Sequence, residues 1–170
     1  LAATAIIKRH DPNLNFVLPA VPHLLPMIKC LVAGSGVTIL DQPEDLIPAL
    51  QASDAMIATS GTITLQAALC GTVGVTCYRT SAFSGFIGRR LVDLDKVILP
   101  NAILGRPLYP FYFQEAANGK TLAAATLDCL YDANAKSSAE QAAIELKSLL
   151  TGGAQSFDEL VISALKNWLD

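Results

Sequence analysis

The sequence predicts an α/β protein built on a parallel, doubly wound sheet with helices on both faces. Two observations support this prediction: short apolar segments alternate with longer segments of helical periodicity, and glycine or proline residues separate them. The intervening segments hold roughly a dozen residues, the length that a crossover between parallel strands requires. With 170 residues, of which 52% are apolar, we expect one domain that spans residues 1–170.

Five segments have the length, apolar content and flanking turn residues that are typical of buried strands. The first, "NFVLPA", lies between the Asp11-Pro12-Asn13 turn and Pro22, and the last, "KVILP", ends at a proline. The predicted strands are residues 15–20, 37–40, 54–59, 73–78 and 96–100.

Helical periodicity fills most of the remaining chain. In the helix that follows residue 40, Asp41 is the expected N-cap and Pro43 falls in the first turn. Gly34 and Gly71 are suited to end two other helices. Residues 101–119 are expected to be irregular, and three helices are expected to close the chain. The predicted helices are residues 1–11, 22–34, 41–53, 61–71, 81–92, 120–133, 138–153 and 156–170.

Charge and composition exclude several classes of function. The net charge is −3 and the pI is about 5.3, so no basic field is present to attract nucleic acid. The four cysteines form no CxxC pair, and neither histidine has a metal ligand at suitable spacing, so we expect no zinc site, disulfide framework or cofactor. No run of about 18 apolar residues occurs, so we expect a cytoplasmic protein without a transmembrane helix.

The segment "ASDAMIATSGTITLQAALCG" places Ser60, Gly61 and Thr62 where a predicted strand gives way to a predicted helix. In an open parallel sheet, ligands bind beyond the carboxyl ends of the strands. Gly61 would let the backbone approach a ligand closely, and the first amides of a helix attract anions. The pattern suits a phosphate or diphosphate. Ser and Thr are also common N-cap residues, so spacing alone leaves both interpretations open.

Four motifs, "SDAMIATSGTITLQAALCG", "VTCYR", "LPNAILGR" and "FQEAANGKTLAAA", resemble in this order the C-terminal domain of the lipid-A-disaccharide synthase family. The upstream "RHDPNLNFVLPAVPHL" resembles a segment of the same family. The family pattern is S-G-T-x-x-L-E, then Y-R or Y-K, then L-P-N, then G-R or G-x, then P-E-x-x-Q-E. The resemblance covers residues 5–165, and the combination of S-G-T-x-x-L with L-P-N at this separation is fairly specific.

The resemblance implies a Rossmann-like half of a two-domain GT-B glycosyltransferase, with additional C-terminal helices. Such a hexosyltransferase moves 2,3-diacylglucosamine from UDP to lipid X in lipid A, and hence lipopolysaccharide, biosynthesis, without a metal. This chain would be the half that binds the UDP-diacylglucosamine donor. It would bind nucleotide weakly and catalyse nothing alone, because a missing N-terminal domain would hold the acceptor and supply the catalytic base. The resemblance leaves open whether the protein forms a homodimer and whether it makes a peripheral contact with the inner membrane.

The resemblance also assigns residues to the site. Ser60, Gly61 and Thr62 would face the diphosphate, and Gln66 would meet the ribose hydroxyls. Arg79 is equally well explained as a solvated loop charge. Asn101 could also start an Asx turn, but the resemblance favours the donor pocket. No catalytic residue is assigned. The implied UDP-sugar-binding residues are Ser60, Gly61, Thr62, Gln66, Arg79, Asn101, Gln114 and Glu115.

Three residues depart from the family pattern. Gln66 replaces a Glu, so its bond to a hydroxyl would lack the charge that strengthens it. Phe111 stands where the P-E motif has its Glu, and Val73 replaces a proline. The family's G-S-R loop, whose Arg is expected at the donor phosphates, has no counterpart in these residues. An alternative function is therefore a non-catalytic binding or assembly module with a degenerate pocket.

Two apolar features allow a further interpretation. The predicted helix with Arg89 and Arg90 suits an anionic membrane surface, and the aromatic segment 109–113 suits acyl chains. Packing in the core explains both equally simply, and we favour it.

Overall fold

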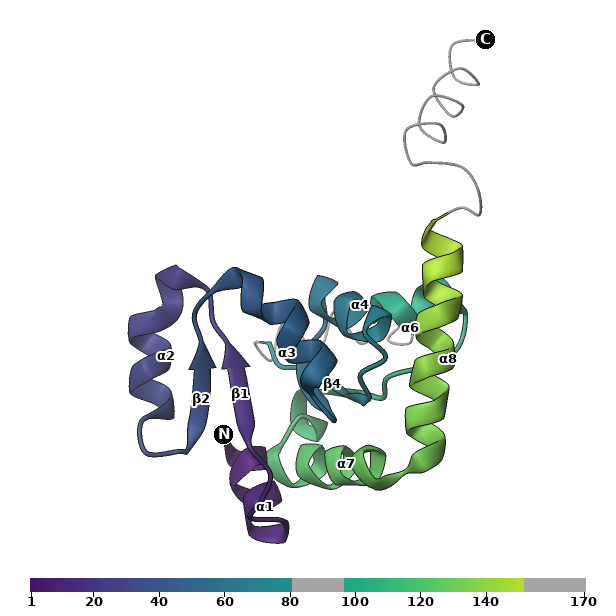
Figure 1. Cartoon of the computed structure of the whole chain (residues 1–170). Coiled ribbons are helices and arrows are strands. Elements are labelled where there is room, and N and C mark those ends of the chain that lie inside the picture. The colour runs from purple at the N-terminus through teal and green to yellow at the C-terminus, as the bar shows by residue number, and fades with distance from the viewer. Residues whose placement is uncertain (81–96, 152–170) are drawn as a thin grey trace.

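The computed structural model describes residues 1–80 and 97–151. The strands are β1 (Phe16–Pro19), β2 (Val37–Leu40), β3 (Met56–Thr59), β4 (Gly74–Tyr78) and β5 (Phe111–Phe113). The α-helices are α1 (Ala2–His10), α2 (Leu25–Val32), α3 (Leu46–Ala52), α4 (Thr62–Leu69), α6 (Leu99–Leu104), α7 (Gly119–Tyr131) and α8 (Ala133–Leu150), and short 3-10 turns cover Pro22–Leu24, Pro43–Asp45 and Gln114–Ala116. Figure 1 shows their arrangement.

All described strand pairs are parallel, which confirms the predicted α/β class. β1 pairs with β2, and a second sheet has the order β3-β4-β5. In the second sheet β4 is central, with Met56 opposite Gly74 and Tyr78 opposite Phe113. The described strands therefore form two sheets rather than one five-stranded sheet.

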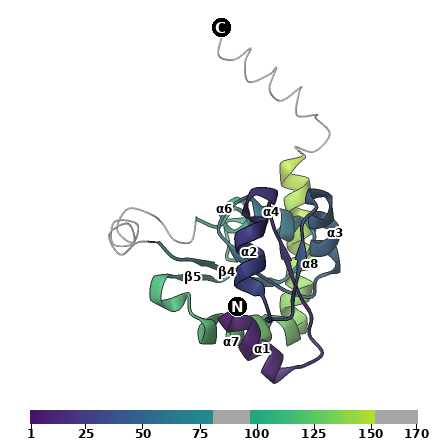
Figure 2. The same ribbon diagram turned by 90° about the vertical axis from the view of Figure 1, so that its left-hand side faces the viewer.

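Helices cover both faces of the three-stranded sheet (Figures 1 and 2). On one face α1 and α7 pack against β4 through a cluster of Ala3, Ile7, Val75, Leu122 and Ala123. On the other face, α3, α4 and α8 pack together with the segments around α6 and β5. That cluster consists of Leu50, Met56, Ala67, Ala68, Ile98, Tyr109 and Leu146. A helical layer on each face is the doubly wound arrangement that the sequence predicts.

β4 is buried from both sides, as expected for a central parallel strand. Val75 and Thr76 point to opposite faces, and both side chains are 0% exposed. The Thr76 hydroxyl donates to the Pro110 carbonyl oxygen at 2.8 Å, which satisfies its hydrogen-bonding need and ties β4 to the start of β5.

Three sequence predictions are wrong. The predicted strand at residues 96–100 is not a strand in its described part, residues 97–100: α6 begins at Leu99, and Pro100 lies in its first turn, where its fixed φ and missing N–H are tolerated. The fifth strand, β5, instead lies within the segment expected to be irregular. Asp41 is not an N-cap, because the turn begins after Gln42 and the Asp41 carboxylate accepts from the Gln42 side chain.

The predicted helices at residues 81–92 and 156–170, with Arg89 and Arg90, lie outside the described residues. Within the described ranges, no helix combines the length and the apolar character needed to cross a membrane.

Gly74→Ala tests the contact between β3 and β4. A Cβ at this position would collide with the Met56 carbonyl oxygen, a backbone atom held in the sheet. We expect the free energy of unfolding to fall by about 1–3 kcal/mol, the usual cost of overpacking a core. Urea denaturation measures this loss, and a change below about 0.5 kcal/mol would show that the strands separate without cost.

Candidate functional site

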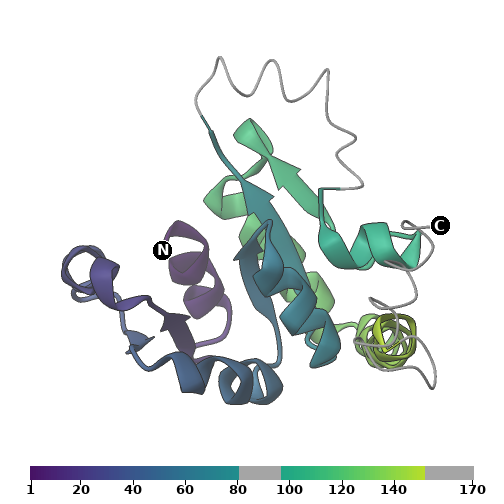
Figure 3. The same cartoon turned by 90° about the horizontal axis from the view of Figure 1, so that it is seen from above.

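The carboxyl ends of β3, β4 and β5 lie side by side, because the three strands are parallel and in register. Thr59 is opposite Cys77, and Tyr78 is opposite Phe113. The residues that follow these strands therefore meet at one edge of the sheet, which we call the carboxyl edge (Figure 3). The structure brings six predicted site residues there: Ser60, Gly61, Thr62, Arg79, Gln114 and Glu115.

Gly61 is the N-cap of α4, so neither Ser60 nor Thr62 occupies the capping position. Because glycine has no side chain, no N-cap side chain satisfies the first amides of this helix. Gly61 has φ 147° and ψ −169°, a backbone conformation that residues other than glycine rarely adopt. Among the described residues, no atom would lie within 4 Å of a Cβ built on Gly61. The turn is thus open on that side, and the helix end can receive an anion.

Gln66 and Thr62 share one face of α4, since they are four residues apart on the helix. Gln66 is partly buried. Arg79 directly follows β4 and is exposed. The exposed Glu115 belongs to the 3-10 turn that begins directly after β5.

Gln114 connects two strand ends. Its side chain is 7% exposed, and its Oε1 accepts a hydrogen bond from the Thr80 amide at 3.0 Å. The bond ties the end of β5 to the segment that follows β4. Gln114 has φ 53°, and within the described ranges it alone among non-glycine residues has a positive φ. Left-handed backbone in a bulky residue is strained and is common at functional sites.

Asn101 is the predicted site residue that the structure does not bring to this edge. Its side-chain amide donates to the Tyr109 carbonyl oxygen at 2.9 Å and accepts from the amides of Leu108 and Tyr109 at 2.9 and 3.0 Å. Tyr109 precedes β5, and its hydroxyl donates to the Thr72 carbonyl oxygen before β4. Asn101 therefore holds the chain at the amino-terminal side of the sheet. The backbone groups that Asn101 binds belong to residues seven and eight positions further along the chain, and no sequence motif predicts these contacts.

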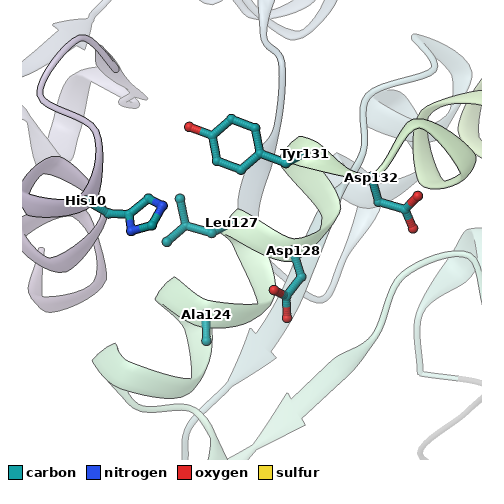
Figure 4. Close-up of a pocket in the computed structure, with 6 residues that line it drawn as sticks. All are labelled: His10, Ala124, Leu127, Asp128, Tyr131 and Asp132. Carbon is teal, nitrogen blue, oxygen red and sulfur yellow. The ribbon is translucent and has the colours of Figure 1, made fainter.

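A shallow groove of about 530 Å³ lies elsewhere, between the ends of α1 and α7 (Figure 4). Here the Tyr131 hydroxyl donates to Asp11 at 3.0 Å. This bond raises the pKa of Tyr131. The pKa of Asp11 is lowered, mainly by a hydrogen bond from the backbone amide of Asn13 and also by the bond from Tyr131. The groove is lined by His10, Ala124, Leu127, Asp128, Tyr131 and Asp132.

The groove is distant from the carboxyl edge. α7 starts close to the end of β5, and Tyr131 is the last of its 13 residues, so at 1.5 Å per residue the two ends of the helix are about 18 Å apart. None of the predicted site residues lines the groove. It is therefore not the site that the sequence predicts.

The titratable side chains offer little other chemistry. In the described ranges, no group of three or more His, Cys, Asp or Glu residues could hold a metal. Burial raises the pKa of the Cys129 thiol to about 11 and also raises that of Cys77, so neither thiol is poised as a nucleophile at neutral pH.

Comparison with known proteins agrees with the motifs. The profile of the lipid-A-disaccharide synthetase family matches residues 2–164. The chain belongs to this family. It is similar to proteins named lipid-A-disaccharide synthase from Paraburkholderia phytofirmans and Paraburkholderia xenovorans, with 36% identity over 97% of the chain and 43% of each relative. The corresponding protein of Nitrosococcus oceani is 30% identical over 98% of the chain and 43% of the relative. The chain thus spans less than half the length of these relatives.

Asn101→Ala tests the structural role of this asparagine. The change removes the acceptor of two backbone amides, one of them buried, and the donor to the Tyr109 carbonyl. We expect a loss of about 2–4 kcal/mol in the free energy of unfolding, since unsatisfied buried polar groups are costly. Chemical denaturation measures it. Asn134→Ala on the exposed surface of α8 is the control and should change stability by less than about 0.5 kcal/mol. Equal stability of the two variants would refute the role.

Proposed function

We propose that this chain is the domain of a lipid-A-disaccharide synthase-like glycosyltransferase that binds the UDP-sugar donor. The observation that carries the proposal is the turn at Gly61, which is open on its Cβ side and starts a helix at the carboxyl edge of a parallel sheet. Nucleotides bind at such edges, with their phosphates at the amino terminus of a helix.

In the proposed complex the diphosphate lies against the first amides of α4 and the hydroxyls of Ser60 and Thr62. Arg79 faces the phosphates from the neighbouring strand, and its planar guanidinium can form two parallel hydrogen bonds to phosphate oxygens. Gln66 meets the ribose hydroxyls from the next turn of α4. Glu115 adds an acceptor for sugar hydroxyls.

Two predicted residues take supporting roles in this proposal. Gln114 keeps the ends of β4 and β5 together through its bond to Thr80. Asn101 acts at a distance, by fixing the segment that leads into β5.

The catalytic contribution of this domain is electrostatic. When the bond between the sugar and UDP breaks, negative charge develops on the diphosphate, and preorganised amides, hydroxyls and Arg79 stabilise it. In the intact enzyme the donor is UDP-2,3-diacylglucosamine and the acceptor is lipid X, held by a separate domain at the cytoplasmic face of the inner membrane. That domain supplies the base that deprotonates the acceptor hydroxyl, so this chain alone binds donor without turnover.

A non-catalytic binding or assembly module is the second candidate. Gln66 lacks the charge of the family's Glu, and the ring of Phe111 packs against the core cluster and lies 6.0 Å from that of Phe113. Phe111 therefore offers no acceptor where the family has a carboxylate. UDP binding separates the two candidates, because only the first requires it.

Arg79→Gln tests the diphosphate contact. We expect UDP to bind the 170-residue chain and the variant to bind it about tenfold more weakly or worse, since hydrogen bonds to charged groups are each worth about 1.5–3 kcal/mol. Isothermal titration calorimetry measures both affinities. Arg9→Gln, at the far end of α1, removes the same charge and should bind like the wild type. No heat with millimolar UDP would favour the non-catalytic module.

Gly61→Val tests the open turn. The added side chain would occupy the space that the ligand needs, so we expect UDP binding to be lost. Gly36→Val is a matched control, because Gly36 also has a positive φ, 72°, and empty space around its Cβ position, but precedes β2. Both variants carry backbone strain, but in the same titration only Gly61→Val should lose the ability to bind UDP. Similar affinities for the two would count against the turn.

A further inference from the structure

The two described sheets have strand orders that fit one larger sheet with a strand missing between them. In a common doubly wound order, the first strand of the chain lies at the centre, the second and third follow on one side, and the fourth to sixth on the other. The pair β2-β1 matches the third and second strands, and β3-β4-β5 matches the fourth to sixth. We call the place between β1 and β3 the central position, and no described strand occupies it.

The helix α1 lies where it would connect a strand at the central position to β1. It leads into β1 and packs in one cluster with Val75 of β4, and Phe16 of β1 packs against the same cluster. α1 therefore contacts strands on both sides of the central position (Figure 3). In parallel sheets a helix that leads into a strand is the crossover from another strand of that sheet.

The backbones of β1 and β3 direct hydrogen-bonding groups toward the central position. The Met56 amide donates to the carbonyl oxygen directly before β4 at 2.9 Å, so the backbone groups of Ile57, the next residue, point away from β4. The Ala20 amide donates to the last carbonyl oxygen of β2 at 2.8 Å, so the backbone groups of Val17, three residues earlier, point away from β2. Among the described residues no strand pairs with these two edges, and such an edge is a template for a further strand.

Apolar side chains beside the central position are exposed. Ile57 is 37% exposed and Val17 is 46% exposed, whereas strands of parallel sheets are normally buried on both faces. Met56 packs on the α4 side of its sheet, so Ile57 faces the α1 side. Phe16 packs on the α1 side, so Val17 faces the other side. A strand at the central position would therefore meet an exposed apolar side chain on each of its faces.

We propose that a β-strand from the part of the intact protein that this chain does not span inserts between β1 and β3, parallel to both. The chain covers 43% of its relatives from Paraburkholderia, so the remaining length is ample to supply a strand. The strand immediately precedes α1, has about five residues and is apolar on both faces. On the β1 side it pairs at Val17, because Pro19 has no amide to donate. Its insertion joins the two sheets into one, and the pairing is independent of nucleotide binding.

The experiment compares the 170-residue chain with the same chain extended at its amino terminus by the segment of about twenty residues that precedes the matched region in the Paraburkholderia phytofirmans relative, enough for a strand and its connection. Amide hydrogen exchange and thermal unfolding are measured on both. In the extended chain we expect the amides of Val17 and Ile57 to exchange at least about tenfold more slowly, and Tm to rise by about 5 °C or more. The amides of Leu18 and Ala58 face β2 and β4, so they should be protected in both chains.

Two substitutions test the side-chain contact. In the extended chain Ile57→Lys would place a charge against the inserted strand, so we expect it to abolish the rise in Tm. Ile144→Lys is the matched control, because Ile144 is 70% exposed on α8, and the rise should remain. In the 170-residue chain each substitution should change Tm by less than about 2 °C, since both side chains are exposed there.

Slower exchange at both Val17 and Ile57, with the rise in Tm lost only in Ile57→Lys, supports the inserted strand. Unchanged exchange in the extended chain, or protection of only one of the two edges, would overturn it. Strong protection of both amides already in the 170-residue chain would also overturn it, because another part of the chain or a second copy would then cover these edges. None of these measurements involves UDP, so a negative result leaves the proposed function untouched.

Discussion

The two-sided burial of β4 is the constraint on which the rest of the structure depends. Val75 faces α1 and α7, and Thr76 faces the layer that contains α4, with no exposed surface on either side chain. A strand buried on both faces needs helices on both faces, and crossover helices make its neighbours parallel. Parallel strands then end at the same edge. The place where a ligand can bind therefore follows from how the core is filled.

The sequence predicts the first four strands because each is a short apolar run between turn residues, and such signals are local. It fails at the segment "KVILP", which looks like a strand, because α6 begins at Leu99 and Pro100 lies in the first turn of that helix. It misses β5 because Phe111–Phe113 is only three residues long and follows Pro110. β5 exists through pairing with β4, and pairing between residues more than 30 positions apart leaves no mark in a local pattern.

The candidate site shows the same division. The turn at residues 60–62 could be predicted, because a glycine between a strand and a helix is a local signal. The roles of Asn101 and Gln114 could not. Asn101 binds backbone seven and eight residues away, and Gln114 reaches the Thr80 amide from another strand. Family motifs name such residues without distinguishing one that touches a ligand from one that holds the backbone in place.

Unusual backbone conformations mark the carboxyl edge independently of any motif. Gly61 leaves β3 with φ 147°, and Gln114 leaves β5 with φ 53°. A glutamine could relieve its strain by shifting its backbone, yet the bond to Thr80 and the burial of its side chain hold it there. A strained conformation such as that of Gln114 persists only where the surroundings enforce it, and such conformations cluster at functional sites. Two unusual conformations flanking the central strand, at one end of the sheet, are what a site that requires precise positioning of loop backbone would produce.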